Sequence, residues 1–166
     1  MWSTARLLRP VYAASANGLP LSCVATPRIK TILGDIGLMQ SVCNRTAADE
    51  WAQQDLLAIY RGALAEQFVG QELAASLPGH ELHWWKRESK NSTAEVDYLV
   101  ELHNGIQPVE VKSGSAGSLK SLHQLLKDHP GCRDGIVLSC APFAELPEQR
   151  LRFIPLYFAG SLNRQG

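Results

Sequence analysis

The chain has 166 residues, of which 45% are hydrophobic and 19% are charged, and its formal net charge is zero. This length and apolar content fit one domain that buries a core of its own. Equal numbers of basic and acidic residues leave no overall basic field, so nucleic acid would have to bind to a local patch. No apolar stretch is long enough to cross a membrane.

The first 34 residues contain basic residues and no acidic residue, as transit peptides do. Pro10 and Pro20 would interrupt an amphipathic helix there, which argues against a transit peptide. We therefore expect residues 1–40 to form a strand-rich lead-in or the truncated edge of a domain. The main domain is expected over residues 41–160, and a polar tail over 161–166.

A long helix is predicted from about residue 46 to 77, because apolar residues recur at helical spacing and no proline interrupts them. Thr46 is a candidate N-cap, and Gly62 marks a potential break into two helices. Glu66 lies among small and apolar neighbours in this segment. That setting suits a carboxylate that points into a site, although a boundary glutamate is the simpler interpretation of this residue alone.

Downstream of this helix the pattern is α/β. Strand-like segments cover residues 81–87, 94–103, 106–112, 135–140 and 151–158. Between the third and fourth strands, residues 118–128 place four leucines on one helical face, with Ser115 or Ser118 as the N-cap. A strand–helix–strand unit implies a parallel strand pair and a right-handed crossover.

The Asn104-Gly105 dipeptide between two strand-like segments predicts a hairpin with a two-residue type I′ turn. In that register Asp97 faces Lys112, and Glu110 lies one diagonal step away. Because side chains alternate along a strand, the three polar groups share one face. The apolar residues of the hairpin fall on the other face: Val96, Tyr98, Val100, Val109 and Val111. Pro108 removes a backbone donor, which suggests an edge strand or a bulge.

Asp97 on one strand and Glu110-Val111-Lys112 on the next form the pattern of a metal-dependent phosphodiesterase. Carboxylates are hard oxygen ligands for a divalent cation, and a lysine can orient or activate a water molecule beside it. A solvated, charged face of an amphipathic hairpin is the usual explanation for any one of these residues. Their joint spacing, with Glu66 upstream, favours a site.

Several segments resemble those of a known family. They cover residues 30–38, 62–69, 84–87, 94–100, 108–114, 118–122 and 154–157. Together they are similar to the C-terminal domain of unknown function 4143 of bacterial and archaeal AAA-type ATPases. That domain is placed within the PD-(D/E)XK nuclease-like superfamily, and the resemblance spans about residues 18–160.

This resemblance implies a restriction-endonuclease-like α/β core, with a mixed central β-sheet flanked by helices. It also implies Mg²⁺- or Mn²⁺-dependent hydrolysis of phosphodiester bonds in DNA or RNA. The metal would be held by Asp97, Glu110 and the backbone carbonyl of Val111. Glu66 would join the metal directly or through water, and Lys112 would position the attacking water.

The alternative is a nuclease-shaped module that no longer cuts and serves as a partner-binding or regulatory domain of an AAA-type ATPase. The sequence contains no G-x-x-x-x-G-K-[ST] phosphate loop, so the ATPase module is expected on another chain or lost by truncation. A binding module would use exposed apolar residues around Trp84 and Trp85. A nuclease would use a basic patch near Lys86, Arg87 and Lys90.

The four cysteines show no Cys-x-x-Cys or Cys/His ligand spacing, which argues against a zinc site. Scattered thiols in a chain of this size fit a reducing compartment. We therefore expect a cytoplasmic protein. The sequence also contains no Gly-x-Ser-x-Gly nucleophile elbow.

Overall fold

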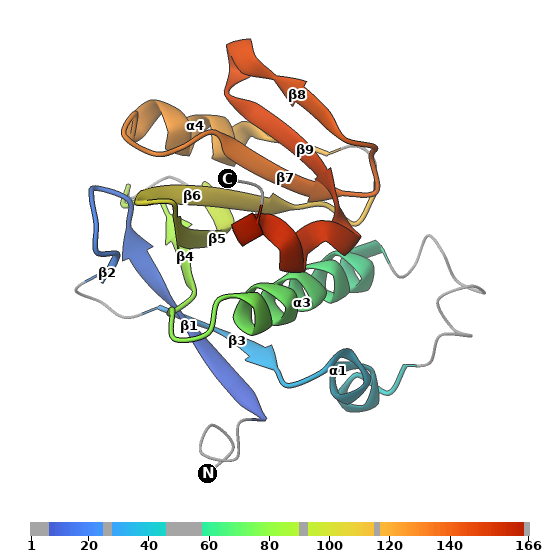
Figure 1. Ribbon diagram of the computed structural model, residues 1–166. Helices are drawn as coiled ribbons and strands as arrows, with labels where there is room; N and C mark the ends of the chain where they lie inside the picture. The colour runs from blue at the N-terminus through green and yellow to red at the C-terminus, as the bar shows by residue number, and fades with distance from the viewer. Residues whose placement is uncertain (1–6, 25–27, 46–57, 90–92, 115–116, 165–166) are drawn as a thin grey trace.

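The strands of this protein join in one mixed, nine-stranded sheet with helices on both faces, which makes the fold α/β (Figure 1). The computed structural model describes residues 7–24, 28–45, 58–89, 93–114 and 117–164. The strands are β1 (Leu8–Ser15), β2 (Ser22–Cys23), β3 (Ile29–Leu33), β4 (His83–Lys86), β5 (Glu95–Leu102), β6 (Gly105–Val111), β7 (Gly135–Ser139), β8 (Ala144–Leu146) and β9 (Leu151–Pro155). The helices are α1 (Ile36–Val42), α3 (Ala58–Ser76), α4 (Lys120–Asp128) and the 3₁₀ helices η1 (Pro147–Gln149) and η2 (Leu156–Arg164).

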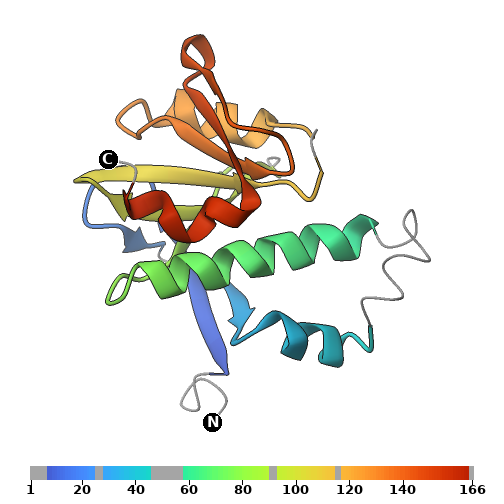
Figure 2. The same cartoon turned by 45° about the vertical axis from the view of Figure 1, so that its right-hand side comes forward.

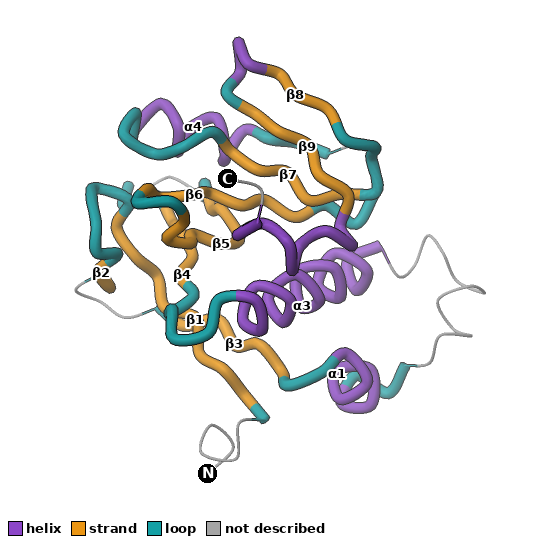
Figure 3. The backbone as a smooth tube through the Cα atoms, viewed as in Figure 1, coloured by secondary structure: helices purple, strands orange, loops and turns teal. Residues whose placement is uncertain are grey.

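The sheet has the strand order β2-β1-β4-β5-β6-β7-β9-β8, and β3 pairs with β1 (Figure 3). β4, β5 and β6 are antiparallel neighbours. β6, β7 and β9 run parallel, so their carboxyl ends lie at the same edge of the sheet. The predicted parallel pair around the 118–128 helix is therefore confirmed as β6 and β7.

Two hydrophobic cores cover the two faces of the sheet. On one face α3 and η2 lie side by side across the strands (Figure 2). The core beneath them includes Val69, Leu73, Val109, Leu138 and Leu162. On the other face α4 packs through its buried leucines, Leu122, Leu125 and Leu126, as its sequence period predicts.

The first and last described segments, β1 to β3 and η2, belong to this sheet and its cores. β1, β2 and β3 make the expected lead-in strand-rich, and Val11 of β1 is fully buried. The polar tail expected over 161–166 is corrected, because η2 continues to Arg164 and Leu162 is only 4% exposed. A single leucine among polar residues gives little sequence signal, yet here it is enough to anchor the segment.

Of the helix predicted over about 46–77, residues 46–57 lie outside the described residues; the rest is present as α3, which passes through Gly62 without a break. A glycine inside a helix costs only about 1 kcal/mol, which the packing of α3 offsets. The candidate cap Thr46 lies outside the described residues. The N-cap position of α4 is Leu119, one residue after the expected Ser118, whose Oγ still accepts a hydrogen bond from the Lys120 N–H at 3.5 Å; Ser115 is not described.

The short elements that were not predicted from the sequence include α1, β8 and η1, and η2 begins within the predicted strand 151–158. A signal for α1 was present, because the side chain of Asp35 accepts a hydrogen bond from the Leu38 backbone N–H at 2.8 Å. Aspartate is a favoured N-cap for this reason. Three exposed residues make up β8, which pairs only at the edge of the sheet, and such a strand leaves little pattern to read.

The β5–β6 hairpin turns one residue earlier than its sequence predicts. His103 and Asn104 occupy the turn with φ values of 49° and 58°, as a type I′ turn requires, and Leu102 pairs with Gly105. Arg133 packs against this turn: a Cβ at Gly105 would lie 2.9 Å from its side chain, and its guanidinium donates to the His103 carbonyl at 3.4 Å. The register shifts by two residues, so each residue of β6 keeps its predicted face.

Pro108 does not mark an edge strand, because β6 is flanked by β5 and β7. Pro108 pairs with Leu99, and the parallel pairing with β7 starts at the next residue, Val109. Pro108, which has no backbone N–H to donate, therefore lies before the residues of β6 that pair with β7.

Two glycines of α3 allow a matched test of this packing. A Cβ at Gly70 would lie 2.5 Å from both Ile32 and the Tyr98 hydroxyl, whereas a Cβ at Gly62 meets nothing within 4 Å in the described chain. We expect Gly70→Ala to lower the free energy of unfolding by ~1–3 kcal/mol through overpacking. Gly62→Ala should raise it by ~0.5–1 kcal/mol through helix propensity. Urea unfolding of both variants measures the difference, and equal effects would contradict the close approach of α3 to β3 and β5.

Candidate functional site

A β-bulge in β5 determines where the side chain of Asp97 lies. The β4–β5 pairing advances three residues along β5 for two along β4, as the pairs Trp85–Val96 and His83–Leu99 show. A bulge of this kind sets two residues of one strand against a single residue of the other and breaks the alternation of side chains. Tyr98 then packs into the core under α3, while Val96 packs into the core under α4. The sequence-based assignment of Val96 to the face of Tyr98 is therefore wrong.

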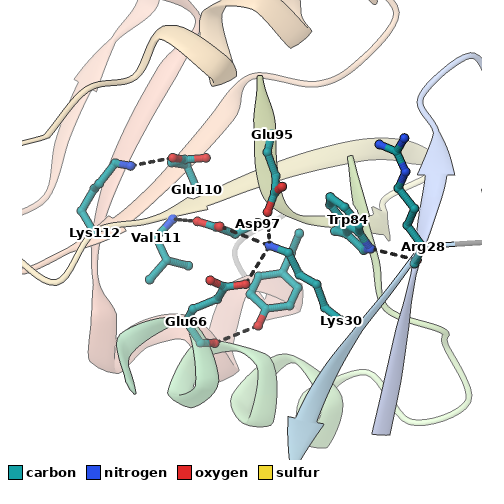
Figure 4. A network of polar contacts seen from close by, with 10 residues as sticks. Arg28, Lys30, Glu66, Trp84, Glu95, Asp97, Glu110, Val111 and Lys112 are labelled. Atoms are coloured by element: carbon teal, nitrogen blue, oxygen red, sulfur yellow. Dashed lines mark hydrogen bonds and ion pairs between the residues drawn. The ribbon is translucent and has the colours of Figure 1, made fainter. Parts of the chain in front are cut away.

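The bulge consists of Asp97 and Tyr98, which lie opposite Trp84. The Asp97 side chain is held between β6 and β3. Its Oδ2 accepts a hydrogen bond from the Val111 backbone N–H at 2.8 Å. Its Oδ1 lies 3.7 Å from the ammonium nitrogen of Lys30 (Figure 4). The neighbouring Tyr98 donates its hydroxyl to the backbone carbonyl of Glu66 at 2.8 Å, which ties β5 to α3.

The Lys30 side chain from β3 stands at the centre of the cluster. Its Nζ lies 2.8 Å from Glu66 Oε1 and 2.7 Å from Glu95 Oε1. The same ammonium sits 5.0 Å from the centre of the Trp84 ring, within reach of a cation–π contact. Three elements far apart in sequence, β3, α3 and β5, thus meet through one positive charge (Figure 4).

Glu110, in β6, and Lys112, one residue beyond the end of β6, form a second ion pair. The Lys112 ammonium donates to Glu110 Oε1 at 2.6 Å. The Glu110 side chain is only 7% exposed, and its other oxygen, Oε2, accepts no hydrogen bond from any described residue. A buried carboxylate oxygen without a donor is costly, and few native structures keep one without a reason.

The charges of this cluster shift each other's protonation. Burial, then the charges of Glu110 and Glu66, raise the pKa of Asp97 to about 7. Burial also raises the pKa of Glu110, against the opposing effect of Lys112. Burial alone would lower the pKa of Lys30, but its carboxylate partners outweigh that effect and raise it, so this ammonium stays charged.

The structure brings the predicted site residues together in two pairs. Glu66 and Asp97 both contact Lys30, and Glu110 contacts Lys112. The charge of Glu110 contributes to the raised pKa of Asp97, so the two pairs interact electrostatically, and we refer to them together as the acidic cluster. Within the described ranges, no three Asp, Glu, His or Cys side chains are arranged to hold a metal ion directly.

Sequence reasoning missed Lys30 and Glu95, although both contribute charge to the cluster. Lys30 carries no local signal, because it is one of several basic residues in a segment without acids. Glu95 precedes Asp97 by two residues, and a second carboxylate on the same strand is a signal that could have been read.

The expected surface around Trp84 and Trp85 is corrected by the structure. These residues are only 5% and 3% exposed. Trp84 donates its indole N–H to the Arg28 carbonyl at 3.3 Å, and Trp85 meets the His129 ring edge to face. β4 is a central strand, and its two tryptophans pack into the cores on opposite faces of the sheet. The local sequence does not show that helices and loops cover both faces there.

Of the basic patch expected nearby, Arg87 forms an ion pair with Asp128 at 2.9 Å, and Lys90 lies outside the described residues. Among the helices that the structure describes, none combines the length and apolar character needed to span a membrane.

A comparison with protein families matches residues 61–158 to the family described as Domain of unknown function (DUF4143). The match covers more than half of the chain, so the protein belongs to this family. Glu66, Asp97, Glu110 and Lys112 lie inside the matched range, and Lys30 lies before it. No curated protein and no solved structure gives a significant match.

The raised pKa of Asp97 makes stability depend on pH. Its pKa is higher in the folded chain than the ordinary 3.8, so the folded chain holds this proton more tightly. The resulting stabilisation is present at acid pH and is lost as the pH rises through about 7. Asp97→Asn keeps an oxygen for the Val111 N–H and removes the charge. We therefore expect it to raise Tm by about 3 °C at pH 8 without metal, the shift that ~1 kcal/mol gives in a domain of this size.

The advantage of Asp97→Asn should shrink as the pH falls to 5, because the wild-type carboxyl is then protonated. Thermal unfolding at a series of pH values, with metal chelated, measures the effect. Glu145→Gln on the exposed edge strand β8 is the control and should show no such trend. A constant Tm difference between Asp97→Asn and wild type at all pH values would contradict the assigned electrostatics.

Proposed function

We propose that this protein is a Mg²⁺- or Mn²⁺-dependent phosphodiesterase that cleaves nucleic acid, built on a restriction-endonuclease-like core. The observation that carries the proposal is the buried Oε2 of Glu110, which lacks a donor in the described chain beside a second buried carboxylate, Asp97. Like charges in a poorly hydrated site are relieved by a cation. Oxygen atoms of carboxylates are the ligands that Mg²⁺ and Mn²⁺ prefer.

The charge balance of the cluster supports a divalent cation. The cluster holds four carboxylates, Glu66, Glu95, Asp97 and Glu110, and two ammonium groups, Lys30 and Lys112. With all of them ionised, two negative charges remain without a counter-ion. One divalent cation supplies that charge, and without it protonation of Asp97 is the remaining way to reduce the repulsion.

Each side chain has a role in the proposed reaction. Asp97 and Glu110, with the Val111 carbonyl, would hold the metal, and Glu66 would join directly or through water. When bound, the metal neutralises and polarises a phosphoryl oxygen of the substrate. The Lys112 ammonium is anchored by Glu110 and partly exposed, so it can orient a water molecule toward the phosphorus.

The second candidate function is a nuclease-shaped module that does not cut and binds an AAA-type ATPase. The observation in its favour is Lys30, whose ammonium already forms ion pairs with Glu66 and Asp97 without any metal. A partner surface would then lie away from the buried tryptophans. Tyr157 and Phe158 of η2 suit it, since they are 74% and 42% exposed and their rings stack at 4.7 Å.

Cleavage of labelled DNA and RNA with Mg²⁺ or Mn²⁺ tests the proposed function. We expect Lys112→Ala to slow cleavage by about two to four orders of magnitude, the usual cost of losing a group that positions a reacting water. Metal binding should survive in this variant, because an ammonium group is not a ligand. Asp97→Ala and Glu110→Ala should lose both metal binding and cleavage, and Glu66→Ala should show a milder defect.

Lys120→Ala, on the exposed first turn of α4, is the matched control and should cleave as the wild type does. A Lys112→Ala variant that cuts at the wild-type rate would rule out this mechanism. A folded wild-type protein that cuts neither substrate, and whose Tm does not respond to millimolar metal, would favour the partner-binding function instead.

A further inference from the structure

The position of Lys30 conflicts with simple metal binding at the proposed site. Its ammonium forms ion pairs with Glu66 at 2.8 Å and Glu95 at 2.7 Å, and it lies 3.7 Å from Asp97. Two of these three carboxylates, Glu66 and Asp97, are the ones that the proposed function assigns to a metal. A monovalent cation and a divalent cation cannot both stand against the same oxygens without strong repulsion.

We propose that Lys30 is a built-in cation that occupies the carboxylate cluster and that a divalent metal must displace to bind. The metal-free protein would then be a closed form in which the ammonium takes the place of the metal beside Glu66 and Asp97. This inference rests on the proposed metal site, but it does not require that the protein cleaves nucleic acid.

The backbone around Lys30 is fixed, so displacement would take place in the side chain. Lys30 pairs with Val11 of β1 in the sheet. Three residues later, the Gln67 side chain clamps Leu33 by accepting from its N–H at 3.0 Å and donating to its carbonyl at 2.8 Å. β3 is therefore held at both points, and only the four-carbon side chain of Lys30 is free to rotate.

A cleft gives the Lys30 side chain somewhere to go. Lys30 and Glu66 line a cavity of ≈ 360 Å³ between β3, α1 and α3. Its other lining includes Met39, Thr31 and Tyr98, which offer both apolar and hydroxyl contacts. The Lys30 side chain is already 23% exposed, so its ammonium can reach water by a rotation and leave Glu66 and Asp97 to a metal.

Glu110 explains why a metal would still be favoured over Lys30. The ammonium reaches Glu66, Glu95 and Asp97, but the free oxygen of Glu110 has no donor among the described residues. A divalent ion at the site would satisfy that oxygen and bring twice the charge. Lys30 therefore weakens metal binding without replacing all that a metal would do.

The test compares Mn²⁺ affinity in wild type and in Lys30→Met, measured by titration calorimetry on the whole chain. Removing the competing charge should tighten the Kd for Mn²⁺ by about ten-fold or more. Without metal, Lys30→Met should be less stable than wild type, since three carboxylates lose their counter-ion, and its Tm should rise more on adding Mn²⁺. If Lys30→Met does not fold, Lys30→Gln removes the charge and keeps a hydrogen-bond donor.

Two further variants isolate the charge of Lys30. Lys30→Arg keeps the charge and should bind Mn²⁺ with wild-type affinity, as should Lys127→Met on the exposed last turn of α4. An unchanged or weaker Mn²⁺ affinity in the neutral variants would overturn the inference, and so would an equal gain in Lys30→Arg. Tight Mn²⁺ binding by Lys30→Met without cleavage by any variant would retain the inference and reject the nuclease function.

Discussion

The ion pairs around Lys30 join β3, α3 and β5, three elements that no local contact along the chain would bring together. Buried charges are costly unless they are paired, so the ammonium and its carboxylates constrain one another's positions. Other contacts at the same junction act in the same direction. Tyr98 donates to the Glu66 carbonyl, Gln67 clamps the end of β3, and only a glycine fits at position 70. The cluster is thus part of the packing of α3 on the sheet.

The bulge in β5 makes this junction chemically useful. In a regular strand Asp97 and Tyr98 would point to opposite faces of the sheet. The extra residue lets Tyr98 reach α3 while Asp97 lies between the β6 backbone and Lys30. The acidic cluster then forms beside the end of β6, where Glu110 and Lys112 lie. This places an unsatisfied carboxylate oxygen next to a lysine, an arrangement suited to holding a cation and a water molecule.

The two candidate functions differ in what balances this cluster. A nuclease needs the carboxylates for a metal, whereas a binding module needs only the ion pairs that Lys30 already forms with them. Both functions are compatible with the same metal-free structure. They differ in whether a metal ion binds the carboxylates more strongly than Lys30 does. The match of residues 61–158 to the DUF4143 family does not distinguish the two functions; five residues of the cluster lie within it, and Lys30 lies before it.

The sequence by itself determined the α/β class, the amphipathic face of α4, the existence of the β5–β6 hairpin and the placement of Glu110 and Lys112 on one face of their strand. These depend on periodicity, turn chemistry and neighbours along one strand, which are local. Only the tertiary structure shows the hairpin register, the separate faces of Val96 and Tyr98 at the bulge, and the burial of the tryptophans by both layers. It also decided the role of Lys30, because an ion pair between residues 36 positions apart depends on how α3 packs against β3, and no short stretch of sequence encodes that packing.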